Sequence, residues 1–237
     1  MLNKLLVLFS GLTKKYTVSD FKYRTTYQFD ALIDVADKIG RTHPEALPQL
    51  IKLIARKTQA NAMSAALYYK TCEEIYEKVP RIDSNALFID YSAPLNKNME
   101  NLHSIIKKTD YNRPLKLRTD VILPWPWSRD RIVGNLIGRE PRTWRQDLNH
   151  MIEYWLPIGI GFVNNGNHSI ACGIINGEGT IKEYNSYDIS PLYAHIYSNG
   201  KHYLRTHDHS IIGEVKDLEF AAIFEIGRIM ATKGVCA

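Results

Sequence analysis

The chain has 237 residues, of which 45% are hydrophobic and 23% charged, with a net charge of +5 and a pI near 9.0. This composition excludes a largely disordered chain, and no apolar stretch approaches the length of a membrane span. The basic charge favours a nucleotide or nucleic acid as partner. Three scattered cysteines indicate reduced thiols, so we expect a cytoplasmic protein that does not contact a membrane.

Apolar residues at helical spacing predict helices in the first third of the chain, over residues 2–12, 21–39, 44–54 and 61–79. Gly40 is expected to end the second of these helices, Pro44 to begin the third and Pro80 to end the fourth. We therefore predict a helical bundle or cap over residues 1–80. Such a unit offers a surface for a protein partner or for assembly into an oligomer.

Residues 81–114 mix turn formers with short apolar groups and predict a connection, with a strand at 86–91 and a short helix at 97–107. From residue 115 onward, strand and helix patterns alternate. Strands are expected at 115–124, 157–165 and 180–190, and helices from Ser128, at 143–155 and at 168–175.

The end of the chain predicts a hairpin through Ser198, Asn199 and Gly200, followed by a helix at 217–234. Asp217 caps that helix and Gly234 ends it, while Glu225 is expected to pair with Arg228 or Arg131. The predicted fold class is α+β: an N-terminal helical bundle or cap, then a mixed α/β domain with a small sheet over residues 115–237.

The segment FVNNGNHSIACGII, residues 162–175, concentrates polar groups between two apolar flanks. A strand, a turn at Gly166 and a helix near His168 would direct unpaired backbone amides at one place, where an anion binds. We predict a catalytic role for His168. Phosphate-binding roles are predicted for Gly166, Asn167 and Ser169. The alternative is a plain tight turn, which explains the asparagines and the glycine by themselves.

The run GFVNNGNHSIACGIINGEGTIKEYNSYDIS resembles the strand, G-x-H-R turn, helix and strand of the ParB and sulfiredoxin superfamily. Upstream, VILPWPWSRDR is similar to the strand, proline-rich segment and arginine that open the ParB-like domain, and WRQDLNHMIEYW occupies the place of the helix between them. The resemblance covers about residues 118–190. The C-terminal portion also resembles an uncharacterised bacterial domain of unknown function, which implies no activity.

In that superfamily the turn holds a nucleotide phosphate, and its members include DNA clamps, sulfinic reductases, kinases and nucleases. The resemblance implies that Gly166, His168 and either Arg129 or Arg131 contact a phosphate. It implies a phosphotransferase, a nucleotide hydrolase or a nuclease, with Mg²⁺ accompanying the nucleotide. The sequence departs from the motif at Ser169, where the superfamily has an arginine. Without that charge, a non-catalytic sensor or inhibitor that binds a partner is the alternative.

Two further patterns extend the candidate site. Asp188 ends the strand after the turn and is a candidate to bind a metal or to orient His168, although Asp-x-Ser is also a plain helix cap. RQDLNH has the R-x4-H spacing of HEPN ribonucleases, which places Arg145 and His150 on neighbouring helical turns. Asp147 and His150 are alternatively a catalytic acid–base pair beside the turn, or His150 is a buried core residue.

A third function, a nucleic-acid-cleaving toxin or bacterial defence effector, follows from cations interleaved with aromatic residues between 113 and 145. Guanidinium groups bind phosphates and indole rings stack on bases. The alternative is a solvated basic surface with the tryptophans in the core. The residues concerned are Arg113, Lys116, Arg118, Arg129, Arg131, Arg139, Arg142 and Arg145, with Trp125, Trp127 and Trp144.

Overall fold

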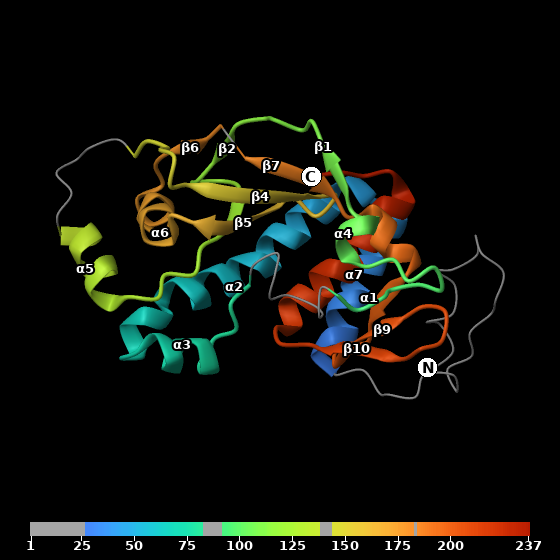
Figure 1. Cartoon of the computed structure of the whole chain (residues 1–237). Helices are drawn as coiled ribbons and strands as arrows, with labels where there is room; N and C mark the ends of the chain where they lie inside the picture. Colours follow the sequence, from blue (N-terminus) through green and yellow to red (C-terminus); the bar gives the residue numbers. More distant parts are fainter. Residues whose placement is uncertain (1–26, 83–91, 138–143, 183) are drawn as a thin grey trace.

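The computed structural model describes residues 27–82, 92–137, 144–182 and 184–237, which form a mixed α+β fold (Figure 1). N-terminal helices precede a β-rich region with small sheets, as predicted for the fold class. The predicted helix at 2–12 and strand at 86–91 lie outside the described residues. Within the described residues, no helix combines the length and the apolar character that crossing a membrane requires.

The N-terminal helices are α1 (Tyr27–Thr42), α2 (Leu47–Tyr68), which follows the short 3₁₀ turn η2 (Pro44–Ala46), and α3 (Cys72–Lys78). Gly40 does not end α1. It lies inside the helix, where a β-carbon would approach the side chain of Ile229 to 2.9 Å, so its role is close packing. The two helices predicted at 44–54 and 61–79 are also corrected: α2 runs through both segments, and the break falls at Thr71, which caps α3 in a capping box with Glu74.

The largest sheet has the strand order β1-β7-β4-β5-β3, in which β4 and β5 are antiparallel while β3 runs parallel to β5. A three-stranded sheet has the order β10-β9-β8, and β2 pairs with β6. The strands are β1 (Lys107–Thr109), β2 (Leu115–Lys116), β3 (Val121–Leu123), β4 (Met151–Leu156), β5 (Ile160–Asn165), β6 (Thr180–Ile181), β7 (Asn185–Asp188), β8 (Ile196–Ser198), β9 (His202–Arg205) and β10 (Ile211–Glu214). The remaining helices are α4 (Leu102–Ile105), α5 (Arg129–Ile137), α6 (Asn167–Asn176), the 3₁₀ segment η3 (Ser190–Ala194) and α7 (Leu218–Lys233).

The helix predicted at 143–155 is wrong, because residues 144–150 form a loop that leads into β4. The loop turns at Asp147, whose side chain accepts a hydrogen bond from the amide of Asn149. Leu148, an apolar residue that a helix at 143–155 would turn toward the core, is 94% exposed. In β4, alternation replaces the helical period: Ile152 and Tyr154 pack in one core cluster and Trp155 in another.

Two smaller expectations also change. The strand predicted at 115–124 is two strands, because Asp120 accepts a hydrogen bond from the amide of Lys116 and turns the chain between β2 and β3. The helix predicted at 97–107 shortens to α4 and is followed by β1. By contrast, the strand before Gly166, the helix after it, the hairpin of β8 and β9, and α7 with its cap at Asp217 are confirmed.

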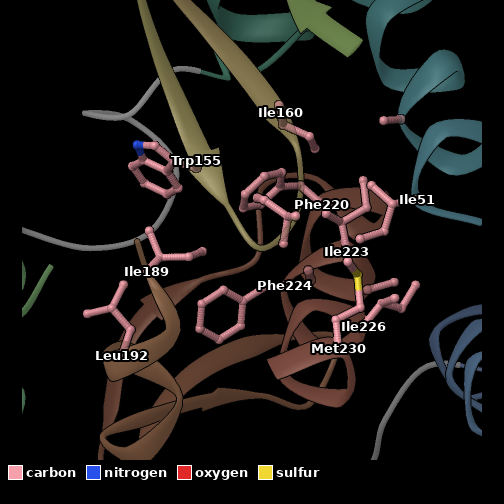
Figure 2. Close-up of a cluster of buried hydrophobic side chains, with 14 of the residues drawn as sticks. Ile51, Trp155, Ile160, Ile189, Leu192, Phe220, Ile223, Phe224, Ile226 and Met230 are labelled. Atoms are coloured by element: carbon pink, nitrogen blue, oxygen red, sulfur yellow. The ribbon is translucent and has the colours of Figure 1, made fainter. Parts of the chain in front are cut away.

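The main core lies between the large sheet and helices α1, α2 and α7 (Figures 1 and 2). Phe220 and Phe224 of α7 are fully buried, and Phe220 contacts Phe162 of β5 edge to face. Ile51 of α2 belongs to the same cluster, so the N-terminal helices and the C-terminal helix share one apolar interior. The predicted division of the chain at residues 80 and 115 stays a prediction.

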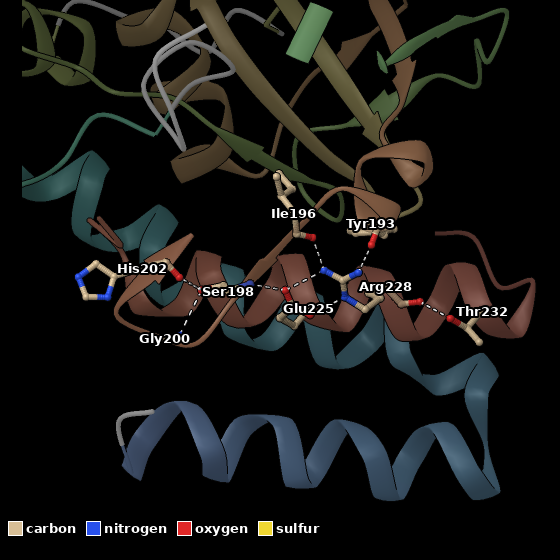
Figure 3. Close-up of polar contacts among 8 residues, drawn as sticks. All are labelled: Tyr193, Ile196, Ser198, Gly200, His202, Glu225, Arg228 and Thr232. Carbon is tan, nitrogen blue, oxygen red and sulfur yellow. Dashed lines mark hydrogen bonds and ion pairs between the residues drawn. The ribbon is translucent and has the colours of Figure 1, made fainter. Parts of the chain in front are cut away.

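A partly buried ion pair of α7 attaches the small hairpin to that helix (Figure 3). Arg228 donates to the carboxylate of Glu225, with 2.6 Å between Nε and Oε2, and to the backbone carbonyls of Tyr193 and Ile196. Glu225 in turn accepts from the amide of Ser198. The prediction that Glu225 pairs with Arg228 is thus confirmed. The pair lies within α7, and its bonds to Tyr193, Ile196 and Ser198 attach α7 to the chain before β9.

Candidate functional site

The predicted turn lies at the carboxyl ends of two parallel strands. β5 leads through Gly166 into α6, and its neighbour β3 leads through Trp125 into α5. In open sheets, ligands bind outside the carboxyl ends of parallel strands, where the following helices begin. The register of β3 and β5 therefore brings the beginnings of α5 and α6 to the same edge of the sheet.

Gly166 is required at the turn for two reasons. Its φ of 85° lies in the left-handed region, and it caps α6 without a side-chain hydrogen bond. A β-carbon there would lie 2.6 Å from Cδ2 of His150 and 3.0 Å from the carbonyl oxygen of Asn149. The turn thus rests directly on the loop before β4, so the predicted residues Gly166 and His150 are brought together.

Asn167 ties the beginning of α6 to the segment after β3. Its Oδ1 accepts a hydrogen bond from the backbone amide of Trp125, at 2.7 Å. The side chain is therefore used within the protein, while the first amides of α6 have no acceptor inside the helix, as at every helix N-terminus.

Replacing Asn167 with alanine is expected to lower the free energy of unfolding by about 1–2 kcal/mol, because the amide of Trp125 loses its acceptor. Chemical denaturation at neutral pH measures this change. Asn165→Ala serves as a control, since Asn165 is exposed and, within the described residues, its side chain accepts a local hydrogen bond from the amide of Gly166. A loss for Asn165→Ala as large as for Asn167→Ala would contradict the assigned contact.

His168 is only 8% exposed and joins the two helices. Its Nε2 accepts a hydrogen bond from the amide of Ser128, at 3.1 Å, and its ring meets the indole of Trp127 edge to face, with 5.2 Å between centroids. Burial, and secondarily the charge of Arg131, lower the pKa of His168 to about 4. The ring is therefore neutral at physiological pH, with its proton on Nδ1. Within the described residues, Nδ1 has no hydrogen-bond partner.

Ser128 directly precedes α5 and accepts hydrogen bonds from its first turn. Its Oγ accepts from the amide of Arg131 at 3.4 Å, and its carbonyl accepts from the amide of Ile132. Since the amide of Ser128 itself donates to His168, the N-termini of α5 and α6 are directly bonded to each other. The positive ends of both helix dipoles therefore lie close together, which favours a negative charge near them.

Ser169 is held by a residue whose role the sequence did not reveal. Nε1 of Trp144 donates to the carbonyl oxygen of Ser169 at 3.0 Å and to its hydroxyl oxygen at 3.1 Å. A β-carbon at Gly179 would lie 2.3 Å from the Trp144 ring, so this glycine makes room for the indole. The pattern of glycines after residue 170 was the available signal, but it does not identify its partner.

The structure separates the two candidate arginines. The guanidinium of Arg129 donates to the carbonyls of Ala66 and Leu67, at 3.2 and 3.0 Å, and thereby caps the end of α2. Arg131 is exposed, and its guanidinium lies 5.0 Å from the centroid of Trp127. Because its charge lowers the pKa of His168, Arg131 is the arginine of the pair that acts on the predicted turn.

His150 is a buried ring packed below the turn. It is 6% exposed and contacts the indole of Trp144, with 4.7 Å between centroids. The amide of Asp147 donates to Nδ1 of His150 at 2.8 Å, and the carboxylate of Asp147 lies 3.1 Å from the same nitrogen. Because the amide hydrogen is fixed, Nδ1 is the acceptor. Since residues 144–150 form no helix, the R-x4-H pair of Arg145 and His150 does not have the helical arrangement that the ribonuclease interpretation requires.

Asp188 lies at the opposite end of the sheet from the turn. β4 pairs Met151 with Asn165 at one end and Leu156 with Asp188 at the other. The two pairs lie five residues apart along β4, a distance of about 16 Å. The carboxylate of Asp188 accepts from the amide of Ser190 and so caps the turn into η3. Across the described ranges, no three His, Cys, Asp or Glu side chains gather as a metal site would need.

Two tryptophans of the basic and aromatic run lie inside the fold, whereas the described cations of the run lie at the surface. Trp125 and Trp144 are each 5% exposed, whereas Trp127 is 41% exposed. The guanidinium of Arg113 is paired with the buried carboxylate of Asp120, at 2.9 Å. Arg139 and Arg142 lie outside the described residues. Trp127 and Arg131 therefore remain as the exposed aromatic and cationic pair beside the turn.

The chain is similar to a known protein family over most of its length. Residues 13–236 match a family described as a family of unknown function (DUF6710). No curated protein and no solved structure matches the chain. Because the match spans almost the whole sequence, both the N-terminal helices and the turn at Gly166 fall inside it, and this chain belongs to the DUF6710 family.

Proposed function

We propose that this protein binds a nucleotide through its phosphate at the joined N-termini of α5 and α6, on a core of the ParB/sulfiredoxin type. The bond from the amide of Ser128 to His168 carries the proposal, because it places two helix N-termini side by side. The order of strand, glycine turn, helix and strand that the resemblance implies supports it, although a loop and β4 replace the helix before that strand.

The donors at this place suit a phosphate group. The first amides of α6 and the Nδ1 hydrogen of His168 are neutral donors, and Arg131 adds one positive charge. The half-exposed indole of Trp127 lies against both residues and offers a surface on which a base stacks. A phosphate carrying an aromatic base would use all of these groups at once.

His168 supports binding more than proton transfer. Its Nε2 lone pair is occupied by the amide of Ser128, and its low pKa leaves it neutral at physiological pH. A general base needs a free lone pair and a pKa near the working pH. We therefore propose that His168 orients the phosphate, and that the protein acts as a nucleotide-binding sensor or regulator of a protein partner.

Calorimetric titration with the common nucleoside triphosphates and with inorganic phosphate, with and without Mg²⁺, tests the proposal. One nucleotide is expected to bind, and Arg131→Met is expected to weaken it by about 10-fold or more, because a charge-assisted hydrogen bond is lost. Trp127→Ala should weaken the binding of the nucleotide but leave the binding of inorganic phosphate unchanged.

Arg118→Met is the matched control, because Arg118 is an exposed arginine near Gly177, at the other end of α6. It should bind like the parent. His168→Ala is a poor probe, since removing a buried acceptor also destabilises the fold. The absence of binding by every nucleotide and by phosphate, or an equal loss in Arg118→Met and Arg131→Met, would rule the proposal out.

A further inference from the structure

Helix α5 is packed far more loosely than the other helices of the site. Of its nine residues, only Ile132 is buried, whereas Val133, Leu136 and Ile137 are 37%, 47% and 78% exposed. In α6, half of the ten residues are buried. Since local opening is least costly where few apolar groups are buried, α5 is the element of the site that opens most easily.

Among the described residues, two polar anchors hold α5, and both lie at its beginning. Arg129 donates to the last carbonyls of α2, and the amide of Ser128 donates to His168 at the start of α6. The exposed apolar residues lie in the second half of the helix, beyond these anchors. Helix α5 is thus anchored at its N-terminal end, and we call it a strap. Arg131 lies within one helical turn of the anchored end.

We infer that α5 is a movable strap, hinged at Ser128 and Arg129, that closes over the anion held by α6. The ligand in this inference rests on the proposed function. The loose packing of α5 and its anchoring by Arg129 do not depend on that function. Closing brings the charge of Arg131 onto the ligand beside the indole of Trp127, which lies against both Arg131 and His168. Arg129 is then a positioning residue, which acts on the ligand through α5.

Hydrogen exchange followed by mass spectrometry tests the strap without a ligand. Peptides covering 129–137 of the ligand-free full chain are expected to exchange about 100-fold faster than those covering 167–176. Millimolar ATP, CTP or inorganic phosphate, whichever binds in calorimetry, should slow exchange in α5 by about 10-fold. Arg129→Met should speed exchange in α5 and leave α6 and α7 unchanged.

Arg131→Met is the matched variant, because its side chain is exposed and does not anchor α5. It should weaken binding without changing exchange in the ligand-free protein, whereas Arg129→Met should change both. If α5 exchanges as slowly as α6 in the ligand-free chain, or if Arg129→Met leaves α5 unchanged, the strap is wrong and the anion site is unaffected. If no probe binds, the proposed function fails, and the ligand-free comparison still decides whether α5 is hinged at Arg129.

Discussion

Gly166→Ala is expected to lower the free energy of unfolding by about 3–4 kcal/mol. A side chain in the left-handed region costs about 1–2 kcal/mol, and Gly166 has a φ of 85°. The added methyl group would also lie 2.6 Å from the ring of His150 and 3.0 Å from the carbonyl oxygen of Asn149. Relieving such overlap in a packed region costs about 1–3 kcal/mol more. Urea denaturation followed by fluorescence measures the change.

Two comparisons separate these causes. Gly134→Ala, in α5, meets nothing within 4 Å and should be neutral or slightly stabilising, because alanine favours a helix over glycine. In the background of His150→Ala, the cost of Gly166→Ala should fall by the part due to the His150 ring, and the left-handed backbone and the contact with the carbonyl oxygen of Asn149 should account for what remains. A cost for Gly166→Ala below about 1 kcal/mol would contradict the left-handed turn on which the candidate site depends.

The turn itself could be predicted from the sequence because its signals are local. Glycine at 166 supplies the left-handed backbone, the strand before it alternates or stays apolar, and the helix after it is apolar with a glycine at its end. The final helix was equally clear, since Asp217 and Gly234 mark its two ends. Sequence patterns therefore predicted the elements whose ends are marked by their own residues.

The partners of the site residues could not be predicted, because they come from distant segments. Arg129 lies next to a strand end, as a phosphate-binding arginine would, yet its guanidinium is used by α2. Nothing in the local pattern pairs Ser128 with His168, forty residues away. The prediction of a helix at 143–155 failed for a related reason. Its apolar residues fit both the period of a helix and the two-residue period of a strand, and packing against β5 and β7 favoured the strand.

Stability in mildly acidic solution is expected to depend on the buried ring of His168 and the partly buried carboxylate of Asp217, which have opposite effects. The pKa of His168 is lowered from 6.5 to about 4, so between these values the unfolded chain binds a proton that the folded chain does not. Acidification through this window therefore favours unfolding. Asp217, which caps α7, is shifted mainly by burial from 3.8 to about 6, so the folded chain binds its proton first and acidification favours folding. Each contribution is about 2–3 kcal/mol across its window.

Because the two windows overlap, these contributions nearly cancel in the parent protein between pH 4 and 6, and single variants should reveal them. His168→Gln keeps an acceptor for Ser128 but does not titrate, so its stability should rise as the pH falls from 6 toward 4. Asp217→Asn keeps an acceptor for the amide of Phe220, so its stability should fall as the pH drops from 6.5 toward 4.

Unfolding in urea over this pH range measures how the stability of each single variant changes with pH. The double variant should show neither dependence. The two single variants should differ by about 4–6 kcal/mol in the change of stability across the window, which far exceeds the error of denaturant extrapolation. Parallel curves for the two single variants would show that neither group is buried as described. If the stability of His168→Gln changed with pH as that of the parent does, while Asp217→Asn differed, His168 would instead lie in water. The bond that joins α5 to α6 would then be absent.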